Sequence, residues 1–188
     1  RSRLNMLDAG VSIIDESMMA TEAFLKARSG WNAVINADAA IREATALAEE
    51  MSKENILASQ AKGNEALAFL EEAQQDFSQA EAAYPGLDLA AFKAYVAKRI
   101  ESQQAALAAD EAYLSRNKEE LEAQNSRYNA LEEEAAALAQ KLGEDDPEQI
   151  VALRFYEEIE ADQGAYEAER LKAGNADAFL REYLGTAS

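Results

Sequence analysis

The sequence has no cysteine and no histidine among its 188 residues. Without cysteine there are no disulfides, no thiolate metal ligands and no iron–sulfur clusters. Without histidine there is no Ser-His-Asp catalysis, no imidazole ligand for zinc or haem, and no side chain whose ordinary pKa lies near neutral pH. Because these absences remove the commonest catalytic groups, we expect a protein that is not an enzyme and that holds no cofactor and no metal ion.

Residues that interrupt helices or favour strands are also scarce. There are 8 glycines, 2 prolines and 15 β-branched residues, against 42 alanines and 19 leucines. Alanine and leucine are strong helix formers, whereas strands favour valine, isoleucine, threonine and aromatic residues. A chain of this length corresponds to one ordinary domain. The composition therefore predicts a single all-α domain over residues 1–188.

Basic residues number 18 against 36 acidic ones, which gives a net charge of −18. Such a charge repels the phosphates of nucleic acids and the surfaces of anionic membranes. The longest apolar runs, Ala105–Ala109 and Ala135–Ala139, have five residues, whereas a transmembrane helix needs about 20. We therefore expect no nucleic-acid partner and no membrane span within the chain. An acidic decoy that imitates nucleic acid is a minor alternative.

Turn residues and heptad spacing divide the chain into helices. Apolar residues at heptad spacing over the first segment predict that it packs along another helix; they are Leu4, Leu7, Val11, Ile14, Met18, Thr21 and Leu25. Gly30 is expected to end this helix and Asn32 to cap the next. We expect helices at about 4–28, 32–83, 88–142, 147–173 and 176–184. A break in the second helix near Gly63 is left open.

The third segment carries the longest pattern in the chain. Seven consecutive heptad positions are mostly large apolar residues, namely Ile100, Leu107, Leu114, Leu121, Tyr128, Ala135 and Leu142. The second heptad position, three residues after each of these, carries polar residues in the middle of the segment, namely Gln103, Asp110, Asn117 and Gln124. A polar row of this kind either lines a small-molecule pocket between helices, as in sensor domains, or faces solvent. The solvated face is the favoured interpretation.

Short connections make sequential helices antiparallel neighbours. We therefore expect an elongated antiparallel bundle built on a long hairpin, with its tip at Tyr84-Pro85-Gly86. Helices 4–28 and 147–173 should flank the half of the hairpin remote from Pro85, so that this half is a four-helix bundle. The exposed apolar edge of the other half would favour a homodimer.

Three further groups of residues are candidates for binding. Trp31 at the expected first turn either anchors a partner or plugs the end of the bundle, and Tyr84 and Pro85 either contact a partner at the tip or pack on their own helices. Glu144, Asp145, Asp146 and Glu148 could hold calcium. We favour a helix start, because Asp146, Pro147 and Gln149 suit the N-cap, first-turn and capping-box positions. Phe179 and Tyr183 are expected to lie in the core.

The stretch YNALEEEAAALAQKL (Tyr128–Leu142) and the long hairpin with a Pro-Gly tip resemble the helical extracytoplasmic domains of cell-wall-binding lipoproteins from Gram-positive bacteria. The resemblance covers about Val34 to Leu142. It implies a tethered, non-catalytic surface protein with a lipidated cysteine upstream, and it transfers no functional residues. The chain is also similar to the helical-bundle sensor domains of chemoreceptors and sensor kinases.

Two functions are therefore expected. The first is a structural or interaction module on the outside of a bacterial cell, with a protein or cell-wall partner. The alternative is an extracytoplasmic ligand-binding sensor domain with the polar row as its pocket. The start at Arg1-Ser2, without an initiator methionine, indicates a trimmed chain with room for a leader or anchor upstream, and a cytoplasmic location is the alternative.

Overall fold

The computed structural model describes residues 2–143, 146–158, 160–161, 164 and 168, with side chains from residue 14 onward. Four helices are formed, α1 (Ser2–Glu49), α2 (Lys53–Ala83), α3 (Ala90–Leu114) and α4 (Lys118–Leu142). Residues 147–158 form a further helical segment, and no strand occurs within these described ranges. The prediction of an all-α, elongated bundle is confirmed.

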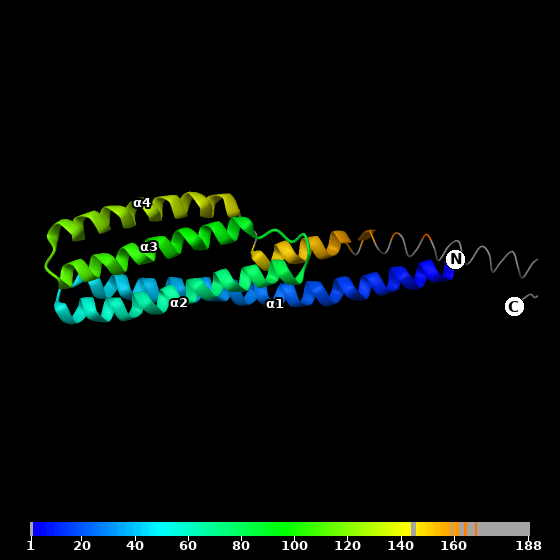
Figure 1. Ribbon diagram of the computed structural model, residues 1–188, viewed down its shortest axis with the longest axis horizontal. Helices are drawn as coiled ribbons and strands as arrows, with labels where there is room; N and C mark the ends of the chain where they lie inside the picture. Colours follow the sequence, from blue (N-terminus) through cyan, green and yellow to red (C-terminus); the bar gives the residue numbers. More distant parts are fainter. Residues whose placement is uncertain (1, 144–145, 159, 162–163, 165–167, 169–188) are drawn as a thin grey trace, which may run out of the picture.

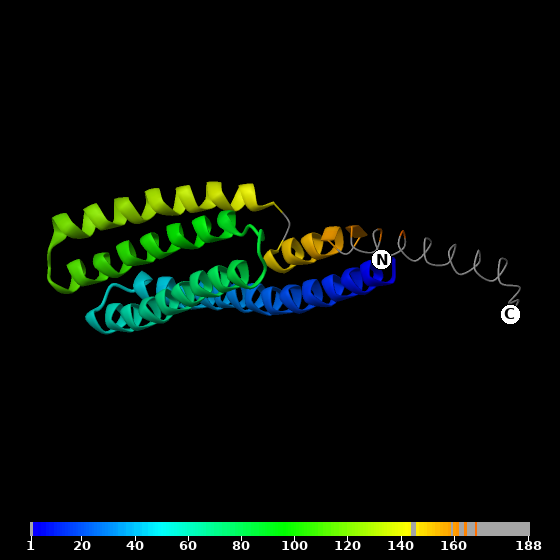
Figure 2. The same ribbon diagram turned by 45° about the vertical axis from the view of Figure 1, so that its right-hand side comes forward.

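Figure 1 shows that α1 extends along both parts of the molecule. Helix α2 returns beside the second half of α1, and α3 and α4 form a second hairpin stacked on this pair. The segment 147–158 runs back beside the first half of α1, as Figure 2 also shows, and its Arg154 contacts Tyr84 at the end of α2. We name residues 30–142 the head, and residues 2–29 together with 147–158 the stalk.

The first predicted turn is wrong, because α1 continues through Gly30 and Asn32 for 48 residues in all. The chain turns instead at residues 50–52, where the Ser52 hydroxyl accepts a hydrogen bond from the backbone N–H of Asn55 at 3.1 Å. Gly63 lies inside α2, so no break occurs there. Both glycines are buried at helix contacts rather than at helix ends.

The predicted continuous helix over 88–142 is also wrong. It is interrupted at residues 115–117, where Arg116 adopts a positive φ of 58°. The Asn117 side chain then caps α4 by accepting from the backbone N–H of Glu120 at 3.1 Å. The turns before α2 and before α4 lie at the same end of the head, and the Tyr113 hydroxyl joins them by donating to the Met51 carbonyl at 2.7 Å. The fold is therefore two stacked hairpins rather than one long one.

The bend at Tyr84-Pro85-Gly86 is present, but it lies where the head meets the stalk and not at a tip. Consequently residues 4–28 and 147–158 do not flank a long hairpin, and the four-helix part is built from α1 to α4. The end of α4 at Gly143 is as predicted. The capping box is also confirmed, since the backbone N–H of Asp146 donates to Gln149 Oε1 at 2.9 Å. The expected helix 176–184, with Phe179 and Tyr183, lies outside the described residues.

Helix α1 buries small residues and leaves large ones exposed. Its buried face consists mainly of alanine, at positions 20, 23, 27, 33, 37, 40 and 44. In contrast, Ile14, Met18 and Leu25 are 60%, 67% and 58% exposed. The first segment therefore packs along another helix, as predicted, but mainly through its alanines rather than through Ile14, Met18 and Leu25. No described helix combines the length and the apolar character needed to cross a lipid bilayer.

Larger side chains fill the space that the small residues of α1 leave. Trp31 meets Phe92 edge to face, with ring centroids 5.8 Å apart, and Phe77 lies 6.1 Å from Phe92. These rings join α1, α2 and α3 at the base of the head. Gly30 permits this packing, because a Cβ atom there would lie 2.7 Å from Phe77 Cε1 and 3.2 Å from the Ala73 carbonyl oxygen.

Gly30→Ala should destabilise the protein by about 1–3 kcal/mol, because the buried Phe77 ring and the α2 backbone have little room to move. This loss should exceed the gain of up to about 1 kcal/mol from the better helix former. The free energy of unfolding, measured by denaturant titration, tests this. Gly164→Ala is the matched control, since nothing lies within 4 Å of a Cβ at this helical glycine, and it should be neutral or stabilising.

Candidate ligand cavity in the head

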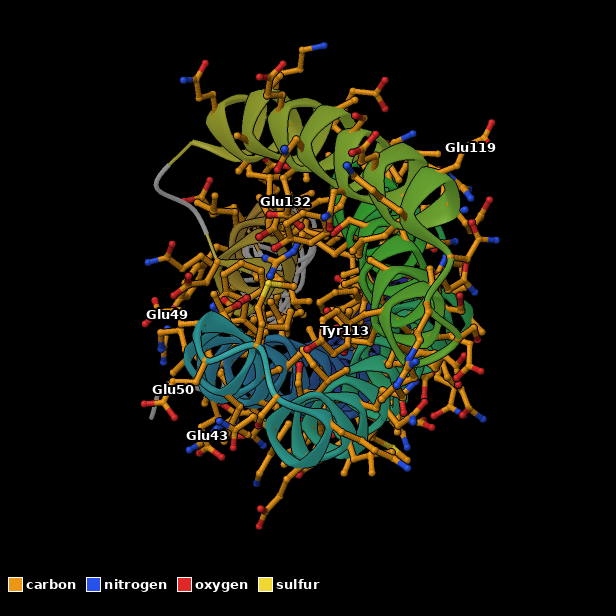
Figure 3. All side chains as sticks on the ribbon, turned by 90° about the vertical axis from the view of Figure 1, so that its left-hand side faces the viewer. Glu43, Glu49, Glu50, Tyr113, Glu119 and Glu132 are labelled. Carbon is orange, nitrogen blue, oxygen red and sulfur yellow. The ribbon has the colours of Figure 1, made fainter. Side chains whose placement is uncertain are left out.

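The four helices of the head border a cavity that is open to solvent on one side. Helix α1 packs on α2, α2 on α3 and α3 on α4, whereas α1 and α4 do not pack along one another within the described chain. Figure 3 looks down the head from its turns and shows the space between α1 and α4. The cavity there has a volume of about 400 Å³, within the usual range for small-ligand sites. Its lining comes from all four helices, at Ile41, Ala44, Thr45, Ala48, Ser59, Gln103, Ala106, Ala109, Asp110, Asn125, Tyr128 and Asn129.

Asp110 is the one charged residue in this lining. Its Oδ2 atom accepts a hydrogen bond from the Ser59 hydroxyl at 3.1 Å, and no cation forms an ion pair with it among the described residues. Burial raises the pKa of the Asp110 carboxyl above its ordinary value, and the bond from Ser59 offsets only part of this rise. The cavity thus contains a half-buried carboxylate without a compensating positive charge.

Gln103 supplies the most deeply buried polar group of the lining. Its side chain is 3% exposed, and no hydrogen bond joins its amide to another group in the described part of the chain. Gly63 makes room for it, because a Cβ atom at residue 63 would lie 2.7 Å from Gln103 Nε2 and 2.8 Å from Leu107 Cδ2. Neither amide atom is among the fully buried, unpartnered side-chain atoms of the described chain, so the amide reaches the cavity and is open to a hydrogen bond with water or a ligand.

A polar bridge joins α1 to α4 one helical turn from the cavity. The Arg99 guanidinium, 11% exposed, binds Asp38 of α1 at 2.8 Å and donates to the Tyr95 hydroxyl at 2.6 Å. Its Nε lies 3.7 Å from Glu132 Oε1 of α4, the same oxygen that accepts a hydrogen bond from the Ser102 hydroxyl. Figure 3 shows Glu132 pointing from α4 into the bundle. This bridge holds the two helices that bound the open side of the cavity.

Of the four polar residues that either line a pocket or face solvent, the structure places two in the lining of the cavity. Gln103 and Asp110 lie one above the other on the inner face of α3. Asn117 lies in the turn, where it caps α4, and Gln124 donates to Glu120 on the surface of α4 at 2.7 Å. The favoured interpretation of a wholly solvated row is therefore wrong for Gln103, which is buried, and for Asp110, which is half-buried.

The sequence did not identify the α4 side of the cavity, which Asn125, Tyr128 and Asn129 form. One signal was present, because Asn117 followed three residues later by Glu120 has the spacing of a helix start. Had this start been recognised, the polar residues about two and three turns further along α4 would have been placed opposite Gln103 and Asp110.

The other candidate binding residues, Trp31, Tyr84 and Pro85, contact other parts of the same chain. Trp31 lies in the middle of α1 against Phe92, neither at a turn nor at the end of the bundle. Tyr84 is fully buried beneath the Arg154 guanidinium, whose Cζ lies 4.5 Å from the ring centroid. Burial, together with the nearby Glu16, raises the pKa of Tyr84 to about 12. Pro85 is exposed, and its carbonyl accepts a hydrogen bond from Arg154.

The candidate calcium ligands Glu144 and Asp145 lie outside the described residues, whereas Asp146 serves as the helix cap. Within the described ranges no group of three or more acidic side chains is arranged to hold a metal ion. A second hollow, beside the turns, is bordered by exposed Lys53, Arg116 and Lys118. The helix starts next to it are already capped by Ser52 and Asn117.

Arg99→Met should lower the free energy of unfolding by about 2–3 kcal/mol, because it leaves the partly buried Asp38 and Glu132 carboxylates without a cation. Chemical denaturation measures this change. Lys98→Met is the matched control, since Lys98 pairs with the more exposed carboxylates of Glu101 and Glu134. A loss for Arg99→Met no larger than that of the control would contradict the bridging role.

Asp110→Asn should stabilise the protein at pH 7, because the folded wild type keeps an unpaired carboxylate half-buried there. Since the folded-state pKa of Asp110 is raised, wild-type stability is lost as pH rises through that value and recovered as pH falls towards the ordinary value of about 3.9. The free energy of unfolding that Asp110→Asn gains over the wild type should therefore become smaller as the pH falls. Unfolding titrations across this pH range test it, and the exposed Glu133→Gln serves as control.

Comparison with known proteins finds no matching family model, no similar curated protein and no similar solved structure. The assignment of a function therefore rests on the geometry of the head and the stalk.

Proposed function

We propose that this chain is a non-enzymatic binding module whose head takes up a small organic molecule. The observation that carries the proposal is the cavity of about 400 Å³, to which all four helices contribute. Two of its polar groups, the Gln103 amide and the Asp110 carboxylate, lack a full set of protein partners. Ligand sites typically combine mainly apolar walls with a few convergent polar groups of this kind.

The chemistry of the lining favours a ligand that carries an ammonium group. Asp110 provides one uncompensated negative charge, and the side chains of Gln103, Asn125 and Asn129 provide amides that donate or accept hydrogen bonds. The Tyr128 ring, on the opposite helix, can face a cation. An anionic ligand would meet both Asp110 and the net charge of −18.

The arrangement of head and stalk supports the sensor form of this proposal. A long hairpin that projected past the start of the chain, towards the membrane, would argue against a sensor. The bend at Pro85 instead lies between head and stalk, and the stalk leads away from the cavity on the side where α1 begins. A head that binds a ligand could therefore be carried on a two-helix connection to a membrane.

A structural module on a bacterial cell surface is the second candidate, and the large apolar side chains exposed on the stalk favour it. The resemblance of residues 34–142 to cell-wall-binding lipoproteins supports the same location. Hydrophobic segments encoded both before and after this sequence in the complete gene would favour the sensor. A lipidated cysteine before it, with no hydrophobic segment after it, would favour the surface module.

Butylammonium should bind in the head and shift the backbone amide resonances of residues around Asp110 and Tyr128, whereas 1-butanol and butyrate should do so at least about tenfold more weakly. Two-dimensional NMR titration of the full chain measures this. Asp110→Asn should abolish the preference for the cation, while Glu133→Gln, which removes one negative charge from an exposed site, should keep it. Equal binding of the three probes, or an unchanged preference in Asp110→Asn, would overturn the proposed ligand class.

A further inference from the structure

The stalk exposes a continuous row of large apolar side chains. Ile14, Met18 and Leu25 follow one another at spacings of four and seven residues, and each is more than half exposed. The same spacing continues towards the start of the sequence at Leu4, Leu7 and Val11. Exposed Arg28 and Asn32 end the row at the base of the head. We name Ile14, Met18 and Leu25 the stalk stripe.

The stalk stripe borders the segment 147–158 only at Leu25, because Ile14 and Met18 do not line the groove between that segment and α1. An apolar groove of about 240 Å³ runs between that segment and α1, with the stripe residue Leu25 and the exposed Tyr156 among its lining residues. The stripe and this groove form one apolar surface, whereas a monomer rarely exposes large apolar side chains in a regular row.

From this surface we infer that two copies of the chain dimerise through α1, stripe against stripe, as a parallel coiled coil confined to the stalk. The spacing of the row is the one that places successive side chains on the seam of a two-stranded coiled coil. A second copy presents a row of the same length and spacing, which a partner of unrelated sequence would have to match by chance.

The distribution of charge supports a second copy at this place. The stalk contains four basic and seven acidic residues, so it carries only −3 of the net charge of −18. Two copies can therefore approach along the stalk with much less repulsion than their heads would experience.

Charge also selects the parallel orientation. Exposed Asp15 and Glu22 follow one flank of the stripe, and Ser17 and Phe24 follow the other. In an antiparallel pair each flank of one chain lies against the same flank of the other chain. Acidic side chains would then face acidic side chains. In a parallel pair the acidic flank meets the uncharged one. The two heads then lie at the same end of the dimer.

Sedimentation equilibrium of the full chain at tens of micromolar should give twice the monomer mass. Met18→Lys and Leu25→Lys should each raise the dissociation constant of the dimer at least about tenfold without loss of helix content, because these side chains are exposed in the single chain. Leu57→Lys, on α2 and 48% exposed, is the matched control and should leave the dissociation constant unchanged.

The absence of cysteine permits a direct test of orientation. Met18→Cys should form an intermolecular disulfide on mild oxidation, because facing seam positions of a parallel pair come within disulfide distance, whereas Leu57→Cys should not. A monomeric wild type whose free energy of unfolding falls in Met18→Lys would show that the stripe is covered by the same chain, and would overturn the dimer. A dimer in which the Met18→Cys variant forms no cross-link would overturn the parallel arrangement. Neither result bears on ligand binding in the head, so the two proposals fail separately.

Discussion

The close approach of α1 and α2 is the constraint on which the rest of the fold depends. Alanine occupies nearly every buried position of α1, and Gly30 lies against the Phe77 ring. Small side chains let two helix backbones lie near one another, so the contact gains dispersion energy over a long interface rather than from a few large residues. Because this face of α1 is continuous, the helix is continuous, and the turn falls only where the alanine face ends.

This constraint explains which parts of the fold could be predicted from the sequence. Helix content, the bend at Tyr84-Pro85-Gly86 and the capping box at Asp146 follow from local chemistry, and they are as predicted. Gly30 was interpreted as a helix end, and a break near Gly63 was left open, because glycine is a poor helix former. Their role is to admit Phe77 from α2, and Gln103 and Leu107 from α3, and such long-range contacts leave no local signal.

The same argument applies to the apolar pattern. Met18 and Leu25 are large, and their spacing predicts burial, whereas the buried side chains of α1 in the stalk are those of Ala20, Ala23 and Ala27. A hydrophobic pattern identifies the surfaces that favour contact but not which contact forms within one chain. For the cavity, the polar residues on α3 were identifiable by their spacing, while those on α4 depended on a turn at residues 115–117 that the long heptad pattern concealed.

Helix α1 is common to both ends of the molecule. At about 1.5 Å per residue, its 48 residues extend roughly 70 Å without an interruption. Ile41, Ala44 and Thr45 form one wall of the cavity, and Met18 lies about six turns away on the same rod. A stiff rod that is displaced at one end transmits the movement to the other, so any tilt or twist of α1 against α4 in the head changes the angle at which the stalk leaves it.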